Sequence, residues 1–118
     1  MADYIIFPGN TGSYKYWFLS DISSNRITAK PGNYMFVKET NSGWVPIYVG
    51  IADNLYDRLH NHEKWQEAQG LGASRVIAHI NLDDQDKSNE EVDLISYWNP
   101  PLNTQHRTRP ISSILGQG

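Results

Sequence analysis

The sequence predicts one small α/β (α+β) domain with a mixed, mainly antiparallel three-stranded central sheet flanked by helices. Two strand-like runs, 33–38 and 45–50, are joined by the polar loop 39–43, which ends in glycine as hairpin loops often do. A helical pattern, a third strand-like run and a second helical pattern follow in that order. The prediction is therefore a β-β-α-β-α core behind an N-terminal aromatic-rich extension, and a chain of 118 residues has room for about one such domain.

The first 31 residues form the predicted extension. Residues 4–7 fit a short strand, and residues 14–19 are rich in aromatic strand formers. We expect these pieces to add edge structure that packs on a core domain of residues 32–103. Residues 104–118 are rich in polar residues and glycine, and we expect a loosely held C-terminal tail.

The first helix is expected after the hairpin. Asp53 or Asn54 can act as its N-cap, and the helix should run to about Gln69, just before two closely spaced glycines. Arg58 and His62 are four residues apart, so a continuous helix would project both from one side.

Residues 75–82 give the clearest strand pattern, because apolar side chains alternate along it. The acidic stretch that follows is interpreted as a loop. Ser88 is then the predicted cap of the last helix, which should end near Trp98, before Pro100 and Pro101.

Composition excludes several classes of protein. The chain has no cysteine, which excludes disulfides, thiolate zinc sites and a cysteine nucleophile. The net charge of −3 argues against a protein that coats nucleic acid non-specifically. No segment has the length of apolar sequence that crosses a bilayer, and the start lacks the features of a signal peptide. We therefore expect a soluble, cytoplasmic protein with no membrane partner.

Several side chains have the chemistry that phosphodiester hydrolysis needs. An arginine fork can bind phosphate, a carboxylate can hold a divalent cation, and phenol or imidazole groups can position water or move its proton. Such groups follow the predicted elements in order, and the candidates are Tyr34, Tyr48, Arg58, His62, Glu91 and Asn103.

The order of these residues resembles the GIY-YIG nuclease domain superfamily over about residues 32–103. The first motif appears as Gly32-Asn33-Tyr34 and the second as Tyr48-Val49-Gly50. The remaining elements are Arg58 with His62 four residues later, Glu91 followed by Leu94-Ile95, and Pro101-Leu102-Asn103.

The resemblance implies a divalent-metal-dependent endonuclease that hydrolyses DNA phosphodiester bonds, in double-stranded or branched DNA, with Mg²⁺ or Mn²⁺. Glu91 would hold the metal, and Arg58 would stabilise the charged phosphate. A homodimer or a partner protein would supply specificity.

The resemblance also implies roles for the other four residues. Tyr34 would orient or deprotonate the attacking water, and Tyr48 would bind the phosphate or assist that water. His62 would act as a base or a proton relay, and Asn103 would brace the site.

Other interpretations remain open from the sequence. Glu91 lies three residues after Ser88, so it could serve only in a capping box. Asn33 replaces the usual isoleucine of the first motif, and Ile51 stands where several members have Lys or Ser. The alternative is therefore a catalytically degenerate module that binds nucleic acid or protein. A third hypothesis is an assembly protein that uses the aromatics of residues 14–18 as an interface.

Overall fold

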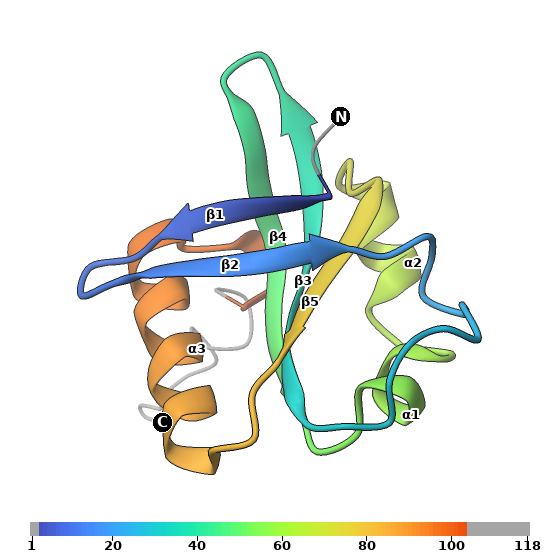
Figure 1. Cartoon of the computed structure of the whole chain (residues 1–118). Helices are drawn as coiled ribbons and strands as arrows, with labels where there is room; N and C mark the ends of the chain where they lie inside the picture. Colours follow the sequence, from blue (N-terminus) through green and yellow to red (C-terminus); the bar gives the residue numbers. More distant parts are fainter. Residues whose placement is uncertain (1–2, 104–118) are drawn as a thin grey trace, which may run out of the picture.

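The computed structural model describes residues 3–103, which form five strands and three helices (Figure 1). The elements in chain order are β1 Tyr4–Pro8, β2 Ser13–Phe18, β3 Gly32–Thr40, β4 Gly43–Ala52, α1 Leu55–Leu59, α2 Trp65–Gly70, β5 Arg75–Ile80 and α3 Asp84–Trp98. The predicted core order is present, with the first helix in two pieces. The predicted tail, 104–118, lies outside the described residues.

The central sheet has five strands, so the prediction of three strands was wrong. Its order is β1-β2-β5-β3-β4, and every pair of neighbours is antiparallel. The aromatic extension supplies the two additional strands. Its β2 joins the sheet by pairing Trp17 with Ala78 and Phe18 with Ile77 on β5, a long-range contact that local patterns do not reveal.

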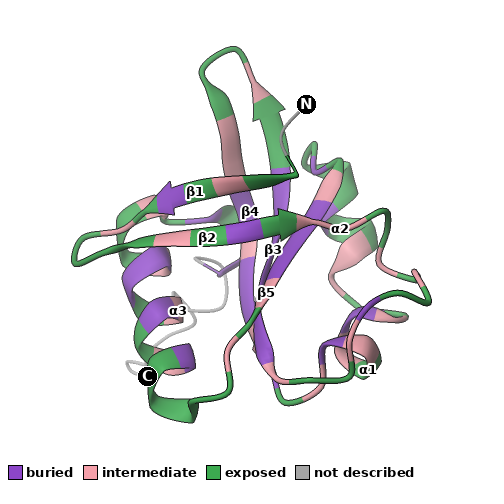
Figure 2. Ribbon diagram, viewed as in Figure 1, coloured by how far each residue is buried: buried purple, intermediate pink, exposed green. Residues whose placement is uncertain are grey.

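The β3–β4 hairpin forms the long axis of the sheet, and β3 is its most covered strand. Residues 32–37 are all buried, because neighbouring strands and packed side chains enclose β3 on both faces (Figure 2). Tyr34 and Phe36 point into one hydrophobic cluster with Leu55 of α1, whereas Met35 packs on the opposite face with Leu94 of α3. The strand therefore connects the two layers of the core.

The helix predicted from 53 or 54 to 69 is interrupted. Asn54 caps α1 by accepting a hydrogen bond from the Asp57 amide at 3.0 Å, as one of the two predicted caps. The helix stops at Leu59, because His60 has extended backbone angles and Asn61 is left-handed with φ of 60°. His62 consequently lies in the connection before α2 rather than on the same helical face as Arg58.

The last helix begins earlier than predicted. Asp83 is its N-cap and accepts from the Asp86 amide at 2.9 Å, so part of the predicted acidic loop is the first turn of α3. Ser88 and Glu91 lie inside the helix. The capping-box interpretation of Glu91 is therefore wrong. The predicted end near Trp98 is confirmed, and β5 stops at Ile80, two residues before its predicted end.

The turn between β1 and β2 is fastened to α3 by one carboxylate. Asp93 accepts hydrogen bonds from the Asn10 and Thr11 amides, the Thr11 hydroxyl and the Tyr14 hydroxyl, at 2.7 to 3.2 Å. These donors hold the pKa of Asp93 below its usual value, with the Tyr14 bond as the largest cause. The N-terminal hairpin is therefore an integral part of the fold. Within residues 3–103, no helix has the length and apolar character needed to cross a membrane.

Candidate active site

The two tyrosine-glycine motifs are neighbours in the sheet, because Tyr34 on β3 is paired with Gly50 on β4. A side chain at Gly50 would collide with the Tyr34 ring. A side chain at Gly32 would collide with the backbone carbonyl of His79 on β5. Both glycines are therefore required by close approach, and Gly50 makes the space that the Tyr34 ring fills.

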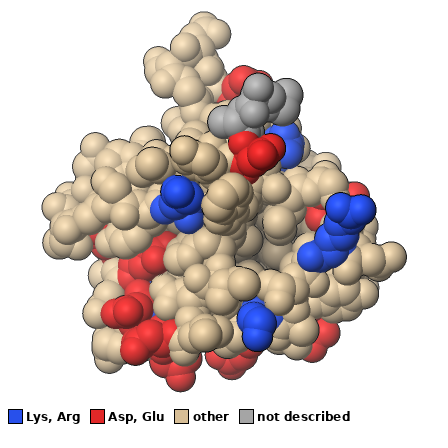
Figure 3. All heavy atoms as spheres, viewed as in Figure 1, with Lys and Arg blue, Asp and Glu red and all other residues tan. Residues whose placement is uncertain are grey.

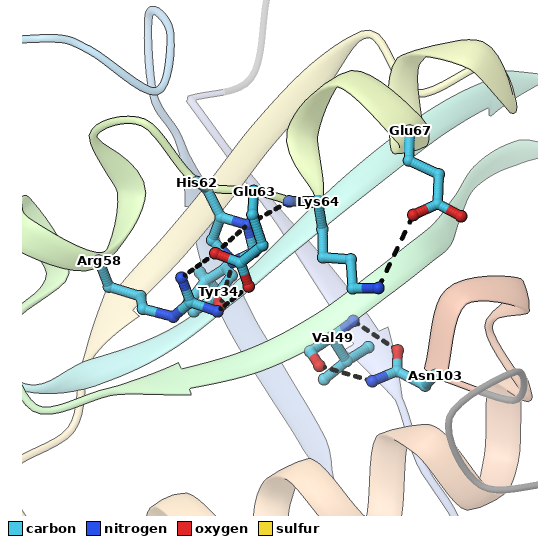
Figure 4. Close-up of polar contacts among 8 residues, drawn as sticks. All are labelled: Tyr34, Val49, Arg58, His62, Glu63, Lys64, Glu67 and Asn103. Carbon is cyan, nitrogen blue, oxygen red and sulfur yellow. Dashed lines mark hydrogen bonds and ion pairs between the residues drawn. The ribbon is translucent and has the colours of Figure 1, made fainter. Parts of the chain in front are cut away.

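Tyr34 is joined to His62 by a short hydrogen bond of 2.7 Å between the phenol oxygen and Nε2 (Figure 4). Both side chains are buried, and Tyr34 is only 1% exposed. The Tyr48 ring completes the cluster, with its centroid 6.2 Å from that of Tyr34 and 5.6 Å from that of His62. Burial raises the pKa of Tyr34 well above its ordinary value, so the phenol is protonated at neutral pH.

The backbone determines which nitrogen of His62 carries the proton. The Lys64 amide donates to Nδ1 at 3.0 Å, so Nδ1 is an acceptor and the neutral ring is protonated at Nε2. His62 therefore donates to the oxygen of Tyr34. Burial, followed by the positive charge of Arg58, lowers the pKa of His62 to about 4, which keeps the ring neutral near pH 7.

Arg58 reaches this cluster from α1, but its fork is occupied. Its two terminal nitrogens donate to the two carboxylate oxygens of Glu63, each at 2.9 Å. This bidentate geometry is the one that arginine also uses for phosphate. The sequence interpretation missed Glu63. The break after α1 lets the chain turn so that Glu63 contacts Arg58. Glu63 follows Arg58 by five residues, whereas side chains that pair along a helix are three or four residues apart.

Glu91 approaches from α3. It is half-buried, and it has no hydrogen bond to another described residue. Burial raises its pKa, which is the expected response of a carboxylate without a partner. The pKa of Tyr48 is raised, mainly because the phenol is buried. The positive charge of Arg58 opposes this rise, and the negative charge of Glu91 adds to it.

Asn103 lies below β4 and makes two hydrogen bonds to a single residue. Its Oδ1 accepts from the Val49 amide at 2.8 Å, and its Nδ2 donates to the Val49 carbonyl at 2.9 Å. In Figure 4 these bonds lie on the other side of β4 from Arg58 and His62. Asn103 thus fixes the edge strand next to Tyr48 without joining the polar cluster.

The six predicted residues are therefore arranged in three groups. Tyr34, Tyr48, His62 and Arg58 form one cluster on a single face, Glu91 on α3 acts on Tyr48 through its charge, and Asn103 holds the strand that carries Tyr48. None of the six lines the hollow of about 820 Å³ near β1 or the groove of about 510 Å³ near β2. The cluster joins the buried Tyr34 and His62 to the partly exposed Tyr48 and Arg58.

The two departures from the family pattern have different surroundings. Asn33 is fully buried and satisfied, because it donates to the Lys87 carbonyl at 3.1 Å and accepts from Asn81 at 3.2 Å. It ties β3 to the start of α3 and takes no part in the cluster. Ile51 is half-buried opposite Asn33, and it adds no charge to the site.

The donor set can accommodate one hard divalent cation. Residues 3–103 contain no group of three or more His, Asp or Glu side chains placed to hold a metal ion. Glu91 nevertheless provides one partly desolvated carboxylate that has no hydrogen bond or ion pair to another residue of 3–103. Mg²⁺ commonly binds through one or two carboxylates and keeps several waters, so a site built on Glu91 alone fits this ion.

Comparisons with known proteins support the fold. No family model matches the chain. The N-terminal GIY-YIG endonuclease domain of UvrC from Thermotoga maritima, in a crystal structure with its catalytic magnesium, has a TM-score of 0.54 and 26% identity. The alignment covers 68% of this chain and 88% of that one. A tyrosine-to-phenylalanine variant of the same domain gives a TM-score of 0.53 and 28% identity, with 68% and 87% covered.

The chain belongs to the GIY-YIG nuclease domain superfamily, as the sequence motifs predicted. Among curated proteins, the UvrABC system protein C of Aquifex aeolicus (strain VF5) is 36% identical over 84 residues. That match covers 66% of this chain but only 14% of the relative. The chain thus corresponds to a small part of that protein's length.

Proposed function

We propose that the chain is a divalent-metal-dependent endonuclease that hydrolyses DNA phosphodiester bonds. The observation that carries this proposal is that a GIY-YIG domain combines a cationic, phenolic cluster around Arg58 with a carboxylate, Glu91, that has no partner within the part of the chain that the structure describes. Hydrolysis by attack of water on phosphorus needs a positioned nucleophile, neutralised charge and a stabilised leaving oxygen. Each need has a candidate residue here.

Arg58 is assigned to the phosphate. Its guanidinium would exchange the two oxygens of Glu63 for two oxygens of the phosphate, which have similar spacing and charge. Glu63 is more exposed than Arg58, with 63% of its side chain accessible against 35%. The exchange can therefore take place by rotation of an exposed glutamate, and it leaves the fold intact.

Tyr34 is assigned to orienting the attacking water, with His62 as its support. Because His62 Nε2–H donates to the phenol oxygen, the Tyr34 O–H is not used by His62, and it would turn from its hydrogen bond with Tyr48 to a water or phosphate oxygen. His62 Nδ1 already accepts the Lys64 amide, and the pKa of His62 is low. Both facts favour this donor role over the predicted role as a base. Removal of a proton by Tyr34 itself would require nearby cations to lower its raised pKa.

Glu91 is assigned to the metal, Mg²⁺ or Mn²⁺, which supplies charge stabilisation for the leaving oxygen when bound. Tyr48 is half-exposed, and the charges of Arg58 and Glu91 both act on it, so it can donate a hydrogen bond to the phosphate. Asn103 holds the β4 backbone that carries Tyr48. These assignments retain the six residues suggested by the sequence, with a positioning role for His62.

A catalytically degenerate binding module is the alternative. The burial of Tyr34 and the occupied fork of Arg58 favour it, because both groups must become accessible before they can act. Such a module would bind DNA or protein but leave it uncut.

The experiment is cleavage of supercoiled plasmid and of branched DNA, with Mg²⁺, with Mn²⁺ and with EDTA. We expect metal-dependent nicking by the unmodified protein. Glu91→Ala and Tyr34→Phe should lose cutting while DNA binding, measured in EDTA, is kept. Absence of cutting on every DNA form with either metal would favour the binding module instead.

A further inference from the structure

The outer face of the β1–β2 hairpin carries an exposed apolar and aromatic patch away from the candidate active site. Tyr4 and Trp17 are cross-strand partners, and Ile6 is the partner of Lys15. All four side chains are exposed, whereas the alternate residues of both strands face the core. Ile80 on β5 is also exposed, at 49%. An exposed apolar patch of this kind marks an interaction surface.

The aromatic rings of this patch already hold a cation. The Lys15 ammonium lies 4.5 Å from the Tyr4 ring centroid and 5.6 Å from that of Trp17. The two rings meet edge to face at 5.2 Å. Phosphate is a ligand group that matches the ammonium, and aromatic bases match the part of the Tyr4 and Trp17 rings that is exposed.

A groove of about 510 Å³ adjoins the patch and shares Lys15, Trp17 and Ile80 with it. Its lining also includes Arg26, and it contains no carboxylate. Figure 3 shows this face with several basic side chains around a central uncharged area, which also has acidic atoms at its upper rim, whereas the largest group of acidic side chains lies over α3. The groove therefore offers positive charge with an apolar floor, although the net charge of the whole chain is −3.

The groove lies on the sheet face that carries the candidate site. Leu55, the first residue of α1, lines the groove, and Arg58 follows it by one helical turn. Leu55 and Ala78 of the groove belong to the same hydrophobic cluster as Tyr34. A nucleic-acid strand bound at one of these places could thus extend toward the other across α1.

We propose that the patch residues Tyr4, Lys15, Trp17 and Ile80, together with Arg26 of the groove, bind an unpaired DNA strand. Bases would stack on Trp17, and phosphates would pair with Lys15 and Arg26. Bases in a duplex already stack on each other, so the exposed rings favour an unpaired strand. This inference rests on the proposed nuclease function, and it adds the form of DNA that the nuclease would prefer. The preferred substrate is then DNA in which an unpaired arm adjoins the cleaved duplex.

The test measures binding of a fluorescent single strand of roughly 12 nucleotides, a length within the range of known single-strand sites, by anisotropy in EDTA. Trp17→Ala should weaken this binding roughly tenfold, as expected for loss of one stacked base, while binding of a duplex of equal length changes little. Lys15→Ala should weaken it less. Tyr97→Ala is the matched control, because Tyr97 is an equally exposed aromatic on α3.

Two results would overturn the inference. Binding of single strands that is unaffected by Trp17→Ala would remove the stacking role. A dimer that dissociates on Trp17→Ala in sedimentation velocity would assign the patch to a second copy of the chain. Failure of the proposed nuclease is distinguishable, since Trp17-dependent binding without any metal-dependent cutting would leave this inference in place.

Discussion

Two tyrosine–histidine pairs lie on different parts of the sheet and have opposite electrostatics. Tyr34 and His62 are joined directly at 2.7 Å, with no carboxylate accepting from either. Tyr16 and His79 both donate to Glu90 instead, at 2.6 and 2.7 Å. Burial and the Arg58 charge lower the pKa of His62, whereas Glu90 raises that of His79 despite the opposing effect of burial.

The difference lies in what completes each pair. Glu90 is 5% exposed and satisfied by two donors, so it makes a closed unit that holds α3 against β2 and β5. The His62 pair is accompanied by a cation, Arg58, whose own anion is the exposed Glu63. An external anion can replace Glu63 but has no place beside Glu90. The first pair is suited to binding phosphate, and the second to stabilising the fold.

Adjacent residues on α3 repeat this contrast. Glu90 accepts hydrogen bonds from Tyr16 and His79, and Glu91 has no partner among the described residues. A structural carboxylate and the candidate metal ligand are thus consecutive residues of α3.

Arg58→Ala should produce the largest difference between the two pairs. We expect cleavage to fall roughly 100- to 1,000-fold, the usual cost of removing one group that stabilises transition-state charge. The measurement is the single-turnover nicking rate with Mg²⁺. Arg75→Ala removes an arginine that packs 4.6 Å from the Phe18 ring and donates to the Leu19 carbonyl, and it should keep the rate within a few-fold. Equal losses in both variants would contradict the assignment.

The two histidines should give opposite dependences of stability on pH. Unfolded His62 binds a proton below about 6.5 and folded His62 only below about 4, so its contribution is complete above pH 6.5 and is lost as pH falls toward 4. The loss amounts to about 3 kcal/mol at most. Folded His79 keeps its proton to higher pH, so its contribution is complete below pH 6.5 and is lost as pH rises through its raised pKa.

Urea unfolding between pH 4.5 and 8.5 measures both effects. His62→Gln should reduce the loss of stability on the acid side, and His79→Gln should reduce it on the alkaline side. Wild-type pH slopes in both variants would show that the two pairs do not differ in the manner described.

Glu63→Gln should have a smaller effect than Arg58→Ala, and it should strengthen DNA binding rather than weaken function. Removing the carboxylate frees the Arg58 fork for phosphate, and we expect DNA affinity to rise about two- to fivefold, since exposed ion pairs contribute less than about 1 kcal/mol. Glu67→Gln makes the same change in net charge at an exposed site that is paired with Lys64. It controls for general electrostatics, and an equal rise in both variants would argue against competition at Arg58.

The sequence predicted the parts of the fold that depend on local signals. The hairpin of β3 and β4 has its polar loop and glycine, and Asn54 is a recognisable cap. The motif order also predicted the superfamily. Pairing of β2 with β5 could not be predicted in this way, because only two residue pairs, distant in the chain, connect them. The break after α1 was missed because the left-handed residue is Asn61 rather than glycine, and no proline marks the break.

Prediction of the site depended on motifs rather than on local geometry. Tyr34, Tyr48, Arg58 and His62 were expected together, and they form one cluster, although His62 reaches it from a loop. Glu63 was missed because its contact with Arg58 depends on that same loop. The roles of all six residues, the domain boundaries and the predicted cytoplasmic location stay predictions.

The most direct test compares Glu91→Gln with Glu90→Gln, in nicking of supercoiled plasmid with Mg²⁺ and in urea unfolding. The account predicts that Glu91→Gln loses cleavage but keeps or slightly gains stability, because the half-buried charge that is removed has no partner in residues 3–103. Glu90→Gln should keep cleavage within a few-fold and lose about 1–3 kcal/mol of stability. Wild-type cleavage by Glu91→Gln, together with loss of cleavage in a folded Glu90→Gln, would contradict it.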